Sequence, residues 1–132
     1  MVQELLQVLC EELALPRPSA SEKKTFLLTL GQARIEFTDL LPGVSMQAPI
    51  CPCPEKKREE FFSYIMRANL LGQGTGGARI GLSAEEKLLT LSLGLPYEMN
   101  YQAFREKLED FINYLVYWRE EVTKFMKQTT LL

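Results

Sequence analysis

The side chains that most often perform chemistry in proteins are scarce in this chain. None of its 132 residues is a histidine, so the commonest general acid–base group and the commonest metal ligand are both missing. Ser-His-Asp and Cys-His catalytic arrangements are therefore excluded. Glu106, Glu109 and Asp110 are interleaved with Arg105 and Lys107, a pattern typical of a solvated helix face with ion pairs. The sequence predicts a protein that is not an enzyme.

The pair Cys51 and Cys53 is the best remaining candidate for chemistry, because two nearby thiolates can bind a metal or cycle as a disulfide. Structural zinc sites normally use two cysteine pairs, each with roughly two to four intervening residues, whereas the one other cysteine here is Cys10. Prolines at 49, 52 and 54 favour a stiff, extended connector. We therefore predict no metal and no cofactor, against the rival hypothesis of a thiol-redox or nucleotide-dependent enzyme.

The segment 72–77 has four glycines in six residues and superficially resembles a phosphate-binding loop. Phosphate-binding glycine loops follow a strand and precede a helix, so that the helix N-terminus faces the phosphate. Here helix-forming residues come before the glycines and a strand-like run comes after them. No Gly-Lys-Ser/Thr is present, so the segment is predicted to be a helix-to-strand connection.

Charge and hydropathy argue against a nucleic-acid partner and against a membrane span. The net charge is −2 and the pI is about 5.3, which gives no basic face for nucleic acid, and the run 56–58 is flanked by glutamates that cancel its charge. No segment approaches the roughly 20 apolar residues of a membrane span, and the N-terminus lacks the basic start of a signal peptide. These features predict a cytoplasmic protein with reduced thiols and no nucleic-acid partner.

Hydrophobic periodicity divides the chain into alternating helices and strands. The first helix should end before Pro16 and Pro18, a polar turn should cover 19–24, and Pro49 should place the third strand at a sheet edge, at least near its end. Gly31-Gln32 should form a tight turn, and Pro54 should lie in the first turn of the second helix. The expected helices start at residue 2, cover 55–71 and run from about 101 to 125, and the expected strands cover 25–30, 33–38, 44–50, 79–82 and 88–93.

The last helix carries the clearest pattern in the sequence. Eight apolar residues follow one another at steps of three and four, and Asn100 can cap the helix start: Tyr101, Phe104, Leu108, Phe111, Leu115, Trp118, Val122 and Phe125. We interpret this stripe as core that covers the sheet, with a coiled coil or a partner groove as alternatives. The chain is therefore predicted to be one α+β domain, 1–132, of order α-β-β-β-α-β-β-α with a single, mainly antiparallel sheet packed by helices.

The stretch from Ala68 to Trp118 resembles the class I type III secretion chaperones, the Tir-chaperone or CesT-like family. The resemblance rests on spaced residues: Ala68-Asn69-Leu70-Leu71, the glycine-rich loop, Ile80-Gly81-Leu82, Leu88 to Leu93, Leu95-Pro96, and Phe104, Leu108, Phe111 and Trp118. It implies a bacterial, cytoplasmic homodimer that binds the N-terminal chaperone-binding segment of a secreted effector in extended, secretion-competent form. A heterodimer with another chaperone is a second possibility.

The same resemblance implies two sets of contact residues. Cargo contacts would come from Val2, Leu5, Leu9, Phe26, Leu28, Ile35, Phe37 and Met46, and dimer contacts from Phe62, Ile65, Met66, Leu70 and Ile80. The alternative function is a dimeric adaptor or structural subunit of a multiprotein assembly without a role in export.

Overall fold

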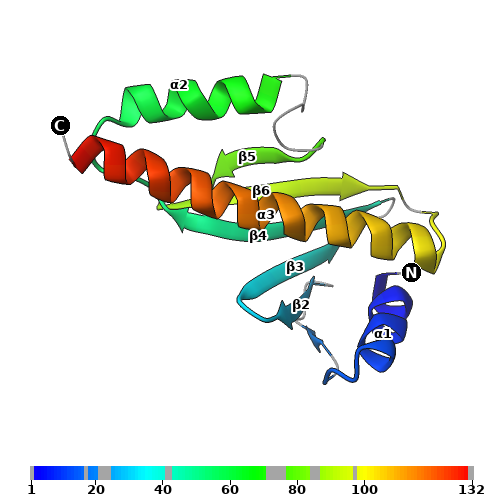
Figure 1. Ribbon diagram of the computed structural model, residues 1–132. Coiled ribbons are helices and arrows are strands. Elements are labelled where there is room, and N and C mark those ends of the chain that lie inside the picture. Colours follow the sequence, from blue (N-terminus) through cyan, green and yellow to red (C-terminus); the bar gives the residue numbers. More distant parts are fainter. Residues whose placement is uncertain are drawn as a thin grey trace.

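Figure 1 shows the protein as a computed structural model that describes residues 2–16, 18–20, 25–40, 43–70, 77–83, 87–96 and 98–130, and these residues form three helices and six strands. The elements in chain order are α1 (Val2–Glu12), β1 (Ser19–Ala20), β2 (Thr25–Leu30), β3 (Ala33–Asp39), β4 (Val44–Pro52), α2 (Arg58–Asn69), β5 (Arg79–Leu82), β6 (Leu88–Leu95) and α3 (Tyr101–Thr130).

All six strands belong to one sheet, in the order β1-β2-β3-β4-β6-β5, and every pair of neighbours is antiparallel. The predicted α+β class and antiparallel sheet are confirmed. One strand was missed, because Ser19 and Ala20, expected in a polar turn, pair with Leu27 and Phe26. Two residues show no hydrophobic alternation from which a strand could be predicted.

The prediction that Pro49 marks an edge strand is wrong for β4 as a whole but holds for its end. β4 lies between β3 and β6, yet its pairing with β3 runs only from Val44 to Gln47. Beyond that point β4 pairs with β6 alone, with a register shift between Pro49 and Cys51. Proline has no N–H to donate to a ladder, and the pairing between β3 and β4 ends at Gln47, two residues before Pro49.

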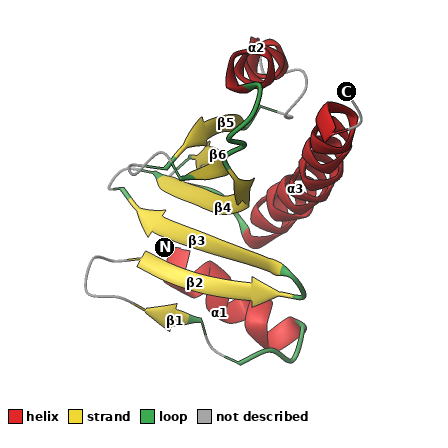
Figure 2. Ribbon diagram, turned by 90° about the vertical axis from the view of Figure 1, so that its left-hand side faces the viewer, coloured by secondary structure: helices red, strands yellow, loops and turns green. Residues whose placement is uncertain are grey.

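The core lies between one face of the sheet and the helices α1 and α3, and α2 adds the buried Phe61 and Ile65 to it. Figures 1 and 2 show α3 crossing this face, with α1 beside the start of α3. Six of the eight stripe residues, Phe104 through Val122, are buried, while Tyr101 and Phe125 are partly buried. The stripe is therefore core, as predicted. Eight such side chains would each stabilise the fold by roughly 1.5 to 3 kcal/mol if fully buried.

The ends of the helices follow local chemistry. Asn100 caps α3 as expected, since its Oδ1 accepts a hydrogen bond from the backbone nitrogen of Ala103 at 2.8 Å. The expected first turn of α2 at Pro54 is wrong, because Lys57 adopts a left-handed conformation (φ 54°) and the helix begins only at Arg58. The turn at Gly31-Gln32 is confirmed, with Gly31 at φ +59°. Of the predicted glycine-rich connection, only Gly77 lies among the described residues.

Candidate partner-binding surfaces

The residues predicted to contact cargo lie largely inside the single chain. Val2, Leu9, Leu28, Ile35, Phe37 and Met46 are all buried in the core between the sheet and the helices. Only Leu5 and Phe26 are partly exposed at its margin. In this arrangement the six buried residues serve packing, and their contact with a cargo stays a prediction.

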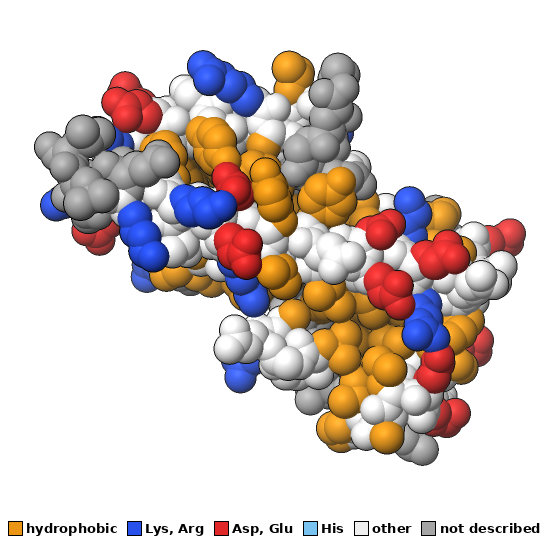
Figure 3. All heavy atoms as spheres, in the orientation of Figure 1, with side chains coloured by type: hydrophobic (Ala, Val, Ile, Leu, Met, Phe, Trp, Pro, Cys, Tyr) orange, Lys and Arg blue, Asp and Glu red, His pale blue; other side chains and the backbone are white. Residues whose placement is uncertain are grey.

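Further apolar side chains are exposed on α1 and in the turn that follows it. Val8 is 44% exposed and Leu13 is 43% exposed. Figure 3 shows hydrophobic side chains gathered over α1 and the sheet beside it, below α3. Glu12, near the end of α1, accepts hydrogen bonds from Tyr101 and Arg105, which fixes α1 against the start of α3. These contacts with α3 therefore hold α1, which carries Val8, in place.

The residues predicted for the dimer interface, on α2 and β5, divide into buried and exposed ones. Ile65 and Ile80 are buried, at 5% exposure each, and hold α2 and β5 to the domain. Met66 is 71% exposed and Leu70 is 67% exposed, the two highest values among the large apolar residues in the described ranges, and Phe62 is partly exposed. The outward side of α2 is thus a second apolar surface.

Aromatic side chains and one hydrogen bond hold α2 against the second half of α3. The Tyr64 hydroxyl donates to Oε2 of Glu121 at 3.0 Å, and its ring stacks on Phe125 with centroids 5.9 Å apart. The Trp118 ring meets Tyr64 edge-on at 5.7 Å. Burial, and then the hydrogen bond to Glu121, raise the pKa of Tyr64 to about 12. These contacts set which side of α2 faces outward.

A side chain also joins α2 to the outermost strand. The carboxamide of Asn69 hydrogen-bonds both the backbone nitrogen and the backbone oxygen of Ile80, each at 2.8 Å. Neither this contact nor Tyr64 was singled out from the sequence. The resemblance included Asn69 within Ala68 to Leu71, which was the one signal in the sequence for this residue.

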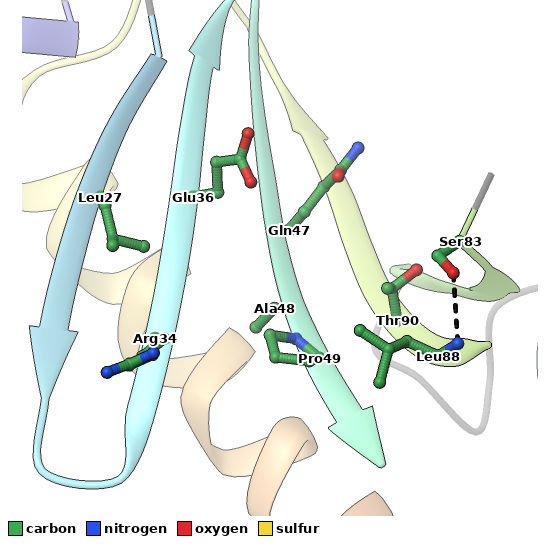
Figure 4. Close-up of a pocket in the computed structure, with 9 residues that line it drawn as sticks. All are labelled: Leu27, Arg34, Glu36, Gln47, Ala48, Pro49, Ser83, Leu88 and Thr90. Atoms are coloured by element: carbon green, nitrogen blue, oxygen red, sulfur yellow. Dashed lines mark hydrogen bonds between the residues drawn. The ribbon is translucent and has the colours of Figure 1, made fainter. Parts of the chain in front are cut away.

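A third feature is a hollow of about 370 Å³ on the sheet face opposite α3. Figure 4 shows its floor at Ala48 and Pro49, where β3 and β4 no longer pair, with Leu27 and Leu88 on opposite sides. Arg34 and Glu36 also line it. The lining of the hollow therefore combines one positive and one negative side chain with separate leucines, and it is neither uniformly charged nor uniformly apolar.

On the side of the sheet that faces α3, Arg119 bridges the gap where β3 and β4 no longer pair. Its Nη1 donates to the carbonyl oxygen of Gln32 at 3.2 Å, and its Nη2 donates to that of Pro49 at 2.9 Å. The guanidinium fork therefore connects the start of β3 to β4 where the ladder between them has ended. No sequence pattern pointed to this residue.

The described residues offer little for a cofactor. Within them, no three His, Cys, Asp or Glu side chains gather so that they could hold a metal ion. Cys51 and Cys53 lie at the end of β4 and just after it, and both are partly buried. Burial, and then the charge of Cys53, raise the pKa of Cys51 to about 11. No helix in the described ranges is long and apolar enough to cross a membrane.

Several solved structures share this architecture. The HopA1–SchA chaperone–effector complex contains a chain that matches with a TM-score of 0.69 and 12% identity, over 90% of this chain and 93% of that one. The Yersinia pestis chaperone SycH, solved with a stable fragment of YscM2, matches with a TM-score of 0.67 and 15% identity, over 89% and 99%. At these identities the likeness shows a shared fold.

The sequence itself gives the family. Residues 5–119 match the Tir chaperone protein (CesT) family, so the chain belongs to that family, as the sequence predicted. A comparison with curated proteins found no match. The fold also occurs in YbjN, a putative transcription regulator from E. coli, with a TM-score of 0.70 and 10% identity over 93% of this chain and 92% of that one.

Proposed function

We propose that this protein is a type III secretion chaperone that binds the N-terminal chaperone-binding segment of an effector in extended, secretion-competent form. The observation that carries the proposal is the family match over residues 5–119. The HopA1–SchA structure, a chaperone–effector complex by its description, has the same fold. Binding of this kind involves no bond-making step, and the proposed site of action is the bacterial cytoplasm.

The sheet offers an edge that suits an extended segment. β1 covers only Phe26 and Leu27 of β2, and the residue before β1 is Pro18, which has no N–H with which to continue the ladder. Among the described residues, pairing on this side of β2 therefore stops before Leu28, and Leu28 to Leu30 have no described strand beside them. An extended peptide gains affinity from main-chain hydrogen bonds at such an edge and specificity from neighbouring apolar contacts.

The apolar surface on α1 supplies those contacts. Val8 is exposed and Leu5 is partly exposed on α1, Leu13 is exposed in the turn that follows α1, and Phe26 is partly exposed on β2. In this proposal Leu5 and Phe26 touch the cargo directly, and the six buried residues of the predicted set support the surface from below. Burial of these side chains by cargo would offset the cost of ordering the segment.

Self-association is proposed through the outward side of α2. Met66 and Leu70 are too exposed to contribute to the core, and burying each would contribute roughly 1.5 to 3 kcal/mol. A twofold interface would bury both residues on each copy. A homodimer is the primary proposal, and a heterodimer with another chaperone would use the same surface.

A second candidate is a dimeric adaptor or structural subunit without an export role. It is favoured by the similarity in fold to YbjN, which is described as a putative transcription regulator. Under that alternative the same apolar surfaces would bind a folded partner.

Co-expression distinguishes the two functions. The full chain would be produced with tagged, isolated N-terminal segments of secreted effectors from the source bacterium, and complexes would be measured by size-exclusion chromatography with light scattering. We expect a dimer that retains one such segment in a protease-sensitive, extended state. A monomer, or a chain that retains only folded partners, would contradict the proposal.

A further inference from the structure

Two hollows adjoin each other along the side of α3 that faces away from α2. Figures 1 and 2 show α2 on one side of α3 and the turn between β2 and β3 on the other. The first hollow, of about 290 Å³, lies between α3 and this turn, and the second, of about 360 Å³, is lined by residues nearer the C-terminus of α3. Arg119 and Glu120 line both. The two hollows therefore form one groove along the helix, the α3 groove.

The end of the α3 groove next to the β2–β3 turn is apolar. Val116 is 49% exposed, and Leu30 and Ile112, which line the groove beside it, are partly exposed. Leu30 is also the last residue of β2, and Leu28 to Leu30 have no described strand on the side of β2 away from β3. An extended segment paired along that part of β2 therefore reaches the apolar end of the groove, where burial of a large side chain would contribute to affinity.

The other end of the α3 groove carries positive charge. It is lined by Arg119, Lys124 and Lys127, against one carboxylate, Glu120. Three positive side chains and one negative give this lining a net charge of +2, whereas the whole chain has a net charge of −2. Lys124 also pairs with Glu121 at 3.6 Å, and its side chain is 69% exposed, so that pair is weak. Charge complementarity therefore favours acidic residues of a partner at this end.

The distance between the two ends sets the spacing of the residues that the α3 groove can bind. Val116 and Lys124 are eight residues apart on α3 (124 minus 116), which corresponds to about 12 Å along the axis of a helix. An extended chain covers about 12 Å in roughly four residues. A matching segment therefore has an apolar residue and acidic residues about four positions apart.

We propose that the α3 groove binds a part of the cargo, which rests on the proposed chaperone function, and that this part is an extended segment with a large apolar residue about four positions from a pair of acidic residues. The apolar side chain packs against Leu30 and Val116, and the acidic pair faces Lys124 and Lys127. The groove thus adds a requirement for acidic residues to the apolar contacts that the cargo makes at α1 and β2.

Two fluorescein-labelled peptides test the α3 groove of the full chain by fluorescence anisotropy. The acidic peptide is Ser-Leu-Val-Leu-Ser-Thr-Ser-Glu-Glu-Ser, and the neutral peptide has Gln-Gln in place of Glu-Glu and otherwise the same sequence. We expect the acidic peptide to bind about fivefold more tightly at low salt, the effect of two exposed ion pairs. Because salt screens such pairs, this preference should shrink at high salt.

Two double variants assign the preference to the groove. Lys124→Gln combined with Lys127→Gln should make the two peptides bind equally, because the partner charges of the acidic pair are gone. Lys56→Gln combined with Lys107→Gln removes the same charge from exposed residues that do not line the groove. This matched control should retain the fivefold preference.

The apolar end of the groove has its own pair of variants. Val116→Ser should weaken the binding of both peptides by about fivefold, because less apolar surface is buried. Leu40→Ser changes an apolar residue that is 58% exposed and does not line the groove, and it should change the binding of neither peptide.

The assignment is overturned if the variant without Lys124 and Lys127 keeps the preference for the acidic peptide, or if Val116→Ser dissociates the dimer, which would show that a second copy covers the groove. A parent chain that retains an effector segment on co-expression but binds the two peptides equally would overturn this inference alone. A parent chain that prefers the acidic peptide but retains no effector segment would overturn the proposed function, and with it the assignment of the groove to cargo.

Discussion

The side chain of Asn69 forms both backbone hydrogen bonds with Ile80 that a neighbouring strand would form. Its Nδ2 donates to the Ile80 carbonyl oxygen at 2.8 Å, and its Oδ1 accepts from the Ile80 backbone nitrogen at 2.8 Å. Ile80 lies on β5, which pairs with β6 on its other side and forms one border of the sheet. The contact closes that border at one residue, as sheets commonly do to avoid unwanted pairing, and ties the end of α2 to the sheet.

Loss of this contact should destabilise the domain. Asn69→Ala removes two hydrogen bonds to partly buried backbone groups, and we expect the free energy of unfolding to fall by about 1 to 3 kcal/mol. Urea denaturation monitored by the single tryptophan, Trp118, would measure the change. Asn113→Ala, an exposed substitution on α3, is the matched control and should change stability by less than about 0.5 kcal/mol. Equal effects for the two variants would show that the Asn69 contact contributes nothing.

Arg119 should contribute comparably through the opening between β3 and β4. Arg119→Met retains much of the aliphatic side chain but leaves the carbonyls of Gln32 and Pro49 without their charged donor. We expect the free energy of unfolding to fall by about 1 to 3 kcal/mol. Lys124→Met removes an exposed cation that pairs with Glu121 at 3.6 Å, and such pairs contribute about 0 to 1 kcal/mol. A Lys124 variant as unstable as the Arg119 variant would contradict this account.

Local periodicity explains why so much of the fold could be predicted from the sequence. Alternation in β3 and the steps of three and four in α3 are properties of adjacent residues, and both elements formed as expected. The misses depend on distant contacts or single dihedral angles. β1 exists because it meets β2, and α2 starts late because Lys57 is left-handed.

The binding surfaces were harder to predict for a related reason. The resemblance implied cargo contacts at Ile35, Phe37 and Met46, but apolar residues that alternate along a strand line the side that faces the core, and all three are buried. The surfaces left for partners depend on which apolar residues fall outside that periodicity, such as Val8. Asn69 and Arg119 act through backbone groups far away in the sequence, which a single sequence does not specify.

The Tyr64 hydroxyl should make stability depend on alkaline pH. Its pKa is raised to about 12 in the folded chain, against about 10 in an unfolded chain. Between these values the unfolded chain loses the proton while the folded chain keeps it. The stabilising contribution is therefore complete below about pH 10 and is lost as the pH rises toward 12.

Tyr64→Phe removes both the hydroxyl and this pH dependence. We expect a loss of about 1 kcal/mol at neutral pH, from the hydrogen bond to Glu121, and a shallower decline in stability between pH 10 and 12. Thermal unfolding over that pH range would measure both. Tyr114→Phe, at another tyrosine of α3, is the control and should keep the parental decline. An unchanged pH profile for the Tyr64 variant would contradict the assignment.

The outward side of α2 gives the sharpest test of self-association. Met66→Lys combined with Leu70→Lys places two charges where the proposed interface is apolar, and burying an unpaired charge costs several kcal/mol. Because both side chains are mostly exposed in the single chain, the variant should fold normally but elute as a monomer in light scattering. Val116→Lys charges an apolar residue of α3 that is 49% exposed and should leave the dimer intact. If the Val116 variant alone dissociates, the interface lies on α3. If the α2 variant stays dimeric with an unchanged dissociation constant, α2 is not the interface, and the exposed apolar side of that helix belongs to another partner.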